Sequence, residues 1–163
     1  MAHKPTAIDF SDKPRAYAEL AQQLEGLLRG EHHRIANAAN TAALLYGSLP
    51  AVNWLGFYFL DDGELVVGPF QGKPACVRIA IGRGVCGAAA ARRNTVVVPD
   101  VHAFADHIVC DADSRSEIVV PLIDNGELFG VLDVDSPELA RFDAADRLGL
   151  ERLAAILVAS LRS

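Results

Sequence analysis

Two turn signals in the middle of the chain constrain its fold more than any other feature. Asp61-Asp62-Gly63 and Asp124-Asn125-Gly126 each separate two short runs that are rich in β-branched and aromatic residues. Turns with Gly after Asp or Asn favour the tight connection between two antiparallel strands. The sequence therefore predicts two β-hairpins, with strands over residues 52–60 and 64–70 and over residues 117–123 and 128–134.

Weaker signals between the two hairpins predict smaller elements. Residues 77–81 and 95–98 have the composition of short strands, and residues 88–92 suit a short helix that follows the glycine loop 82–87. The polar stretch 102–113 predicts a long, irregular loop. Loops of this kind commonly carry binding and catalytic residues.

Helical patterns lie at both ends of the chain. Residues 14–29 and 31–48 predict two helices, and Asp143 can cap a closing helix over 144–161. The positions assigned to the apolar faces are Leu20, Leu24, Leu27 and Leu28, then Ile35, Ala38, Ala39, Ala42 and Leu45, and finally Leu148, Leu153, Ile156, Leu157 and Leu161. Helices from both ends can pack together on one face of an antiparallel sheet. We therefore expect an α+β fold whose other sheet face holds a ligand pocket beneath the long loop.

Length and charge limit the function classes. The chain has 163 residues, which favours a single domain over 1–163 with a short lead-in at 1–13. It has 15 Lys and Arg residues against 21 Asp and Glu residues, a net charge of −6, which argues against nucleic acid and anionic membranes as partners. No signal peptide and no apolar stretch of membrane-spanning length are evident in the sequence, so we expect a cytoplasmic protein.

Three carboxylates are expected to converge at one end of the second hairpin. Asp133 and Asp135 alternate along a strand, so they share one face with Val131 and Phe129. Glu117 begins the partner strand at the same end. The group is either a solvated strand end or a pocket wall, and in a confined pocket like charges would raise at least one carboxyl pKa.

Aromatic residues and cysteines supply the other candidates. Trp54 and Tyr58 lie on one strand face, which suits either the core or a ligand box. Cys110 lies in the long loop, where a thiol is accessible and reactive and where His107 can promote its ionisation. Cys86 lies near a predicted helix start, where the helix dipole favours a thiolate, but its small apolar neighbours equally suit burial. Cys76 precedes a short strand.

The odd number of cysteines does not indicate a structural disulfide framework. Plain burial of each thiol, redox chemistry and metal binding remain open. His102, His107 and Cys110 form an H-x4-H-x2-C arrangement that makes a zinc site the main rival, although no C-x2-C pair is present. The glycines of residues 82–87 do not lie in a βαβ pattern, so a dinucleotide site is not expected.

Taken together, six segments closely resemble the free methionine-(R)-sulfoxide reductases, small enzymes built on a GAF domain. The segments are NWLGFY (53–58), GPFQGKPAC (68–76), GRGVCG (82–87), HIVCD (107–111), SEIV (116–119) and GVLDVDS (130–136). The resemblance extends from about Tyr17 to the closing helix. It implies a GAF-like fold and reduction of free methionine-(R)-sulfoxide, with thioredoxin as the electron source, no metal or organic cofactor, and a homodimer.

The resemblance also implies roles for individual residues. It assigns the nucleophile to Cys110 and the resolving thiol to Cys76, with Cys86 as the second candidate. The substrate box corresponds to Trp54 and Tyr58, and the acids to Glu117, Asp133 and Asp135. In this mechanism a carboxylic acid protonates the sulfoxide oxygen while the thiolate attacks sulfur. The alternative function is a non-catalytic GAF domain that senses a small molecule or redox state.

Overall fold

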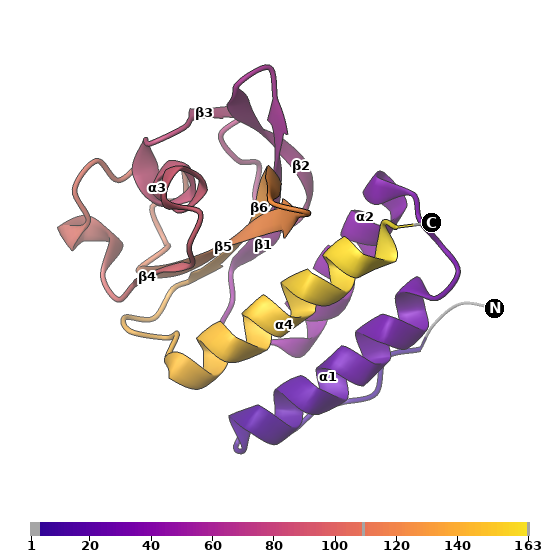
Figure 1. The fold of residues 1–163 in the computed structure, drawn as a ribbon. Coiled ribbons are helices and arrows are strands. Elements are labelled where there is room, and N and C mark those ends of the chain that lie inside the picture. Colours follow the sequence, from indigo (N-terminus) through magenta and orange to yellow (C-terminus); the bar gives the residue numbers. More distant parts are fainter. Residues whose placement is uncertain (1–3, 109, 163) are drawn as a thin grey trace.

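The fold is an antiparallel sheet with three long helices on one face and a short helix on the other (Figure 1). It is known from a computed structural model that describes residues 4–108 and 110–162. Val109 of the predicted loop and residues 1–3 of the predicted lead-in lie outside the described residues. The elements are α1 (Lys13–Leu28), α2 (Arg34–Ser48), β1 (Trp54–Asp61), β2 (Glu64–Gly72), β3 (Arg78–Ala80), α3 (Gly84–Arg92), β4 (Val96–Val98), the 3-10 turn η1 (Val101–Ala103), β5 (Ser116–Asp124), β6 (Glu127–Ser136) and α4 (Ala144–Ser160).

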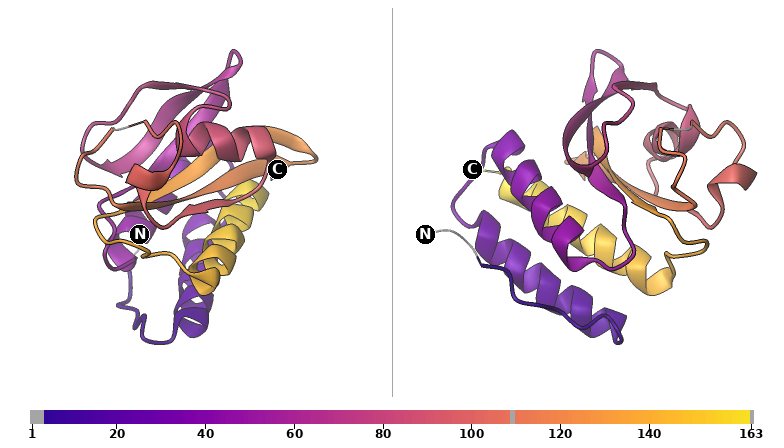
Figure 2. Two further views of the ribbon diagram at one scale, coloured as in Figure 1. Left: turned by 90° about the vertical axis from the view of Figure 1, so that its left-hand side faces the viewer. Right: turned by 180° about the vertical axis from the view of Figure 1, so that it is seen from behind.

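The sheet has the strand order β3-β2-β1-β6-β5-β4, and all of these neighbouring strands pair antiparallel. The hairpins β1–β2 and β5–β6 turn where Asp61-Asp62-Gly63 and Asp124-Asn125-Gly126 predicted. Strand β1 of the first hairpin pairs with β6 of the second, so the two hairpins form one continuous sheet. The α+β prediction, with helices from both chain ends on one face, is confirmed (Figure 2).

The helical layer buries the main apolar core. Helices α2 and α4 pack against one face of the sheet, and α1 packs on these two helices from outside. Leu20 of α1, Leu45 of α2 and Leu153 of α4 are fully buried in this core. Helices α1 and α4 approach closely because Gly149 leaves room for the ring of Tyr17. Three predicted core positions are wrong: Ile35, Ala39 and Leu148 are exposed, and Leu148 retains 71% of its accessible surface. The buried stripe of α4 instead runs through Gly149 and Leu150.

A buried carboxylate joins the start of α4 to the rest of the helical layer. Asp143 caps the helix as predicted, and Asp146 completes a reciprocal capping box with it. The fully buried Asp146 also accepts hydrogen bonds from Tyr17 Oη at 2.8 Å, Lys13 Nζ at 2.7 Å and Arg141 Nη1 at 3.1 Å. These charge-assisted bonds fix α4 against α1 and against the segment that follows β6.

A register shift in the second hairpin corrects one predicted orientation. Leu122 pairs with Gly130, but Ile123 pairs with Leu128, so Phe129 is the extra residue of a β-bulge. Phe129 therefore packs with the helical-side core and stacks on Phe59, whereas Val131 faces the opposite side. The prediction that Phe129 shares a face with Asp133 and Asp135 is wrong, because strict alternation stops at the bulge.

Helix α3 begins four residues earlier than predicted and includes three of the loop's glycines in or beside its first turn. Gly84 has a left-handed φ of +63°, a backbone conformation that is strained for any residue with a side chain. At Gly87 a Cβ would lie 2.6 Å from the carbonyl oxygen of Ala80, so only glycine allows this approach to β3. Helix propensity disfavours glycine, but close packing explains its use here.

None of the helices in residues 4–108 and 110–162 is both long and apolar enough to cross a membrane.

Candidate active site

A pocket opens on the sheet face opposite the long helices, as predicted. Its floor comes from β1, β5 and β6, and its walls come from α3, the segment before β3 and the loop between η1 and β5. Seventeen described residues line the pocket. They include seven of the eight candidates from the sequence, namely Trp54, Tyr58, Cys86, Cys110, Glu117, Asp133 and Asp135. The eighth, Cys76, follows the lining residues Pro74 and Ala75 and is bonded to Cys110.

The three carboxylates converge because of the strand register. Glu117 pairs with Asp135 across β5 and β6, and Asp133 is two residues from Asp135 on the same strand face. Glu117 retains 7% of its accessible surface and Asp133 only 5%. The interpretation as a solvated strand end is therefore wrong: these side chains form a buried pocket wall.

Burial and mutual repulsion hold protons on this wall. Burial is the largest cause that raises the pKa of Glu117 well above its ordinary range, followed by repulsion from Asp133 and Asp135. Burial, and then repulsion from Asp133, raises the pKa of Asp135 in the same way. Burial also raises the pKa of Asp133, although hydrogen bonds from its neighbours oppose the shift. The cluster can therefore hold a transferable proton near neutral pH.

Two aromatic residues form a fixed wall next to the acids. Trp54 and Tyr58 stack with ring centroids 5.9 Å apart, and Phe70 also stacks with Trp54 at a centroid distance of 5.2 Å. Trp54 Nε1 donates to the carbonyl of Lys73 at 3.1 Å, and Tyr58 Oη donates to the carbonyl of Cys76 at 3.1 Å. Both polar tips are thus satisfied, and the rings hold the segment that carries Cys76.

The cysteines divide into a bonded pair and a buried thiol. Cys76 and Cys110 form a disulfide with their Cα atoms 5.6 Å apart, at the mouth of the pocket. Cys86 is free and retains 4% of its accessible surface. Burial, and then repulsion from Asp133 and Glu117, raises the pKa of the Cys86 thiol well above its ordinary value. The expectation that the helix dipole favours a Cys86 thiolate is therefore wrong, because desolvation and negative neighbours outweigh the dipole.

Ion pairs hold the loop that carries Cys110 over the pocket. Lys73 Nζ lies 2.9 Å from Asp113 Oδ2, and Arg83 Nε lies 3.0 Å from Asp106 Oδ2. Ile108 packs over Gly84, where an added Cβ would lie 3.1 Å from the isoleucine side chain. These contacts attach the loop to both rims of the pocket.

The structure does not assemble the zinc arrangement considered from the sequence. Within residues 4–108 and 110–162, the group whose ligand atoms lie close enough for a metal is Cys86, Glu117 and Asp133, not His102, His107 and Cys110. Burial, and then repulsion from His102, lowers the pKa of His107, so this ring is neutral at the pocket rim at pH 7.

Several lining residues have no signal in the sequence. Ser114 retains 6% of its accessible surface and accepts a hydrogen bond from Asn53 Nδ2 at 3.2 Å. Ile79 and Val85 line the pocket as part of the core on this sheet face. Arg83 lines it from the residue that precedes α3. A serine in a polar loop and an apolar residue in a short strand do not stand out without the fold.

Comparison with known proteins shows the family to which the chain belongs. The family model described as GAF domain matches residues 20–161, so this chain is a GAF domain with its pocket on the open sheet face. It is 51% identical to the free methionine-R-sulfoxide reductase of Escherichia coli over 146 residues, which cover 90% of this chain and 88% of that protein. The chain belongs to the free methionine-R-sulfoxide reductase family.

Two solved structures are similar over nearly the full length. The free methionine-R-sulfoxide reductase of Neisseria meningitidis, in complex with its substrate, is 48% identical with a TM-score of 0.92, and the match covers 98% of this chain and 96% of that one. The reduced form of fRMsr from Staphylococcus aureus is 47% identical with a TM-score of 0.89, and the match covers 97% of this chain and 100% of that one.

Proposed function

We propose that this protein reduces free methionine-(R)-sulfoxide to methionine in the pocket described above. One observation carries the proposal: a disulfide at the pocket mouth faces a wall of three carboxylates, the buried Glu117 and Asp133 and the half-buried Asp135. A thiol redox pair and a retained acid are the two chemical groups that sulfoxide reduction needs. The identities of about 50% with reductases over most of their length support the same reaction.

The first step uses Cys110 as nucleophile and the acid cluster as proton donor. The Cys110 thiolate attacks the sulfoxide sulfur while a carboxylic acid protonates the sulfoxide oxygen. The sulfur–oxygen bond breaks, methionine leaves with its sulfur reduced by two electrons, and the oxygen remains on Cys110 as a sulfenic acid. Glu117 is our candidate donor, because its pKa is raised well above the ordinary value by burial and by both aspartates.

The second step regenerates the protein through the disulfide. The Cys76 thiol attacks the Cys110 sulfenic acid, a sulfur–sulfur bond forms, and water leaves. The bonded state of Cys76 and Cys110 supports this assignment of the resolving thiol. Cys86 is the weaker candidate because its buried thiol resists ionisation. A dithiol then reduces the disulfide by exchange.

The carboxylates also account for a preference for the free amino acid. The acids that do not donate the proton offer oxygens to the substrate ammonium group, while Trp54 and Tyr58 contact its side chain. A peptide-bonded methionine sulfoxide has no ammonium group at this position and carries chain on both sides. The pocket walls, closed by the tethered Cys110 loop, leave little room for that chain.

Three further assignments follow from the family resemblance. We propose thioredoxin as the reductant, a homodimer as the assembly, and the cytoplasm as the location. A thioredoxin-type reductant requires a reducing compartment, which supports the location. Leu148, exposed on the outer face of α4, provides an apolar position for a dimer contact. Light scattering of the purified protein tests the dimer, and reduction assays with thioredoxin and thioredoxin reductase test the partner.

The decisive experiment is incubation of the reduced protein with free methionine-(R,S)-sulfoxide, followed by separation of the two diastereomers. We expect loss of the R form alone. In single-turnover assays, Cys110→Ser should abolish reduction, since serine is a far weaker nucleophile and cannot form a sulfenic acid. Cys76→Ser should retain the first turnover but lose thioredoxin-supported cycling. Full retention of the R form would exclude the enzyme and favour a sensory GAF domain.

A further inference from the structure

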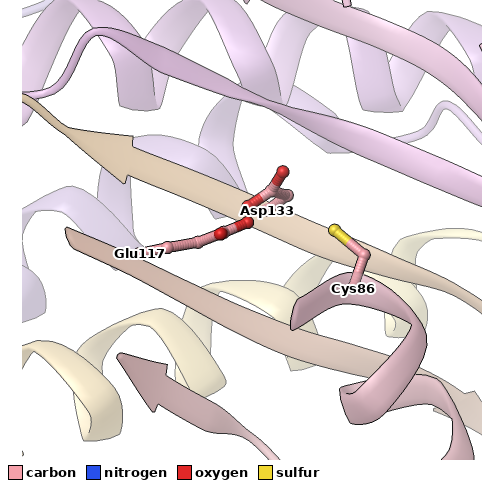
Figure 3. A group of neighbouring side chains, drawn as sticks. All are labelled: Cys86, Glu117 and Asp133. Atoms are coloured by element: carbon pink, nitrogen blue, oxygen red, sulfur yellow. The ribbon is translucent and has the colours of Figure 1, made fainter. Parts of the chain in front are cut away.

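A thiol and two carboxylates meet at one point of the pocket wall. Cys86 comes from the first turn of α3, Glu117 from β5 and Asp133 from β6, and Figure 3 shows the three side chains directed toward a common space. One ligand atom from each, the Cys86 sulfur and an oxygen from each acid, lie within 4.8 Å of one another. All three residues are more than nine-tenths buried.

This cluster contains a polar atom without a partner. Asp133 Oδ1 is fully buried and has no hydrogen-bond partner among the described residues. A buried acceptor without a partner destabilises the fold, so its retention points to a ligand that donates to it or coordinates it. The surrounding charges define the ligand's sign, because Asp135 adds a third carboxylate beside this point.

We propose that Cys86, Glu117 and Asp133 form a binding site for a zinc-class divalent cation, with the fourth coordination position open to the pocket. Three protein ligands and one open position are the usual arrangement of an accessible zinc site. At typical bond lengths, two ligand atoms of a tetrahedral zinc ion lie roughly 3.4–3.6 Å apart. The cluster therefore needs to contract by at most about 1.4 Å to bind the ion.

The donor set selects the class of metal. A thiolate with two carboxylates suits zinc, whereas magnesium and calcium prefer oxygen ligands alone. Metal binding must displace the thiol proton of Cys86 and the proton that the acids retain, and both leave to solvent. The bound ion is not a cofactor of the proposed reduction, since it takes the place of the proton that the sulfoxide oxygen would receive.

Occupation by metal therefore excludes the substrate. This consequence, unlike the site itself, rests on the proposed function, in which the same carboxylates bind the substrate ammonium group and donate the proton. Zinc should consequently act as a competitive inhibitor of the enzyme.

Cobalt(II) gives a direct test, because a thiolate bound to cobalt produces a charge-transfer absorption in the near ultraviolet. The protein is used with its Cys76–Cys110 disulfide intact, so that Cys86 is the one thiol present. We expect one equivalent of cobalt to produce the absorption, one equivalent of zinc to abolish it, and a large excess of magnesium to leave it unchanged. No absorption with excess cobalt would overturn the proposal.

Matched variants locate the site. Cys86→Ala should lose the absorption, whereas the double variant Cys76→Ala/Cys110→Ala, which keeps Cys86 as its one thiol, should retain it. Asp133→Asn, checked for folding by circular dichroism, should weaken cobalt binding at least about tenfold. Retention of the absorption in Cys86→Ala, or parent affinity in folded Asp133→Asn, would refute the assignment.

A final arm separates this proposal from the proposed function. Free methionine sulfoxide should displace cobalt from the disulfide form, and alanine, which has the same chelating amino and carboxylate groups, serves as the control. Displacement by both amino acids alike contradicts competition at the pocket but not the metal site. Reductase activity without any cobalt absorption contradicts the metal site but not the reductase.

Discussion

The free energy of unfolding of Glu117→Gln, relative to that of the parent protein, should rise between pH 5 and pH 7. In the folded state, burial and the two aspartates raise the pKa of Glu117 well above its ordinary value of 4.5. In the unfolded chain the same carboxyl group titrates near that ordinary value. Between these two pKa values the folded state holds a proton that the unfolded state has released, so the free energy of unfolding falls as pH rises.

The size of the effect follows from this linkage. The stability linked to the Glu117 proton is fully present below about pH 4.5 and is lost as pH rises through the folded pKa. One retained proton changes the free energy of unfolding by about 1.4 kcal/mol per pH unit, so the loss between pH 5 and pH 7 is at most about 2.7 kcal/mol. Glutamine does not titrate and removes this loss. We expect the stability of Glu117→Gln relative to the parent to improve by about 1–2.7 kcal/mol over that range.

Urea unfolding at pH values from 5 to 8 measures the effect, with the disulfide kept intact. Trp54 is the single tryptophan of the chain and is buried, so its fluorescence reports the transition. Glu127→Gln is the matched control, because Glu127 is exposed on the same hairpin, and its relative stability should not vary with pH. If the stability difference between Glu117→Gln and the parent is equal at every pH, the raised pKa of Glu117 is refuted.

Three further predictions concern the site and its support. Glu117→Gln should slow single-turnover reduction by roughly 10²–10⁴-fold through loss of general-acid catalysis, and an unchanged rate would move the proton donor to another acid. N-acetylated methionine sulfoxide should react much more slowly than the free amino acid, and equal kcat/KM values would contradict ammonium binding by the carboxylates. Asp146→Asn should lower the free energy of unfolding by about 3 kcal/mol, measured in urea, because it leaves the buried Arg141 charge without its carboxylate partner, whereas the half-buried Lys13 keeps Asp143. A change below about 0.5 kcal/mol would show that these contacts carry little stability.

The hairpin architecture was predictable because local signals specify it. The Gly-containing turn places Glu117 at the same end of the hairpin as Asp133 and Asp135, but the bulge at Phe129 is needed to shift the register so that Glu117 pairs with Asp135. The helix ends were predictable for a similar reason: Asp143 is a local cap that needs no tertiary contact. Predictions failed where packing overrides a local rule. Gly87 lies in a helix because it must approach β3, and Phe129 changes face because a bulge inserts one residue.

The pairing of the cysteines depends on contacts that no local pattern specifies. Cys76 and Cys110 are 34 residues apart, and they meet because the segment before β3 and the loop before β5 lie on adjacent rims of one pocket. Cys86 is nearer to Cys110 in the sequence than Cys76 is. However, helix α3 holds Cys86 beneath the loop and against Glu117 and Asp133. Cys76 and Cys110 both lie on irregular segments outside the strands. Cys86 is fixed beside two buried acids, which disfavour its thiolate. Redox cycling therefore suits Cys76 and Cys110, whereas Cys86 suits the role of a metal ligand.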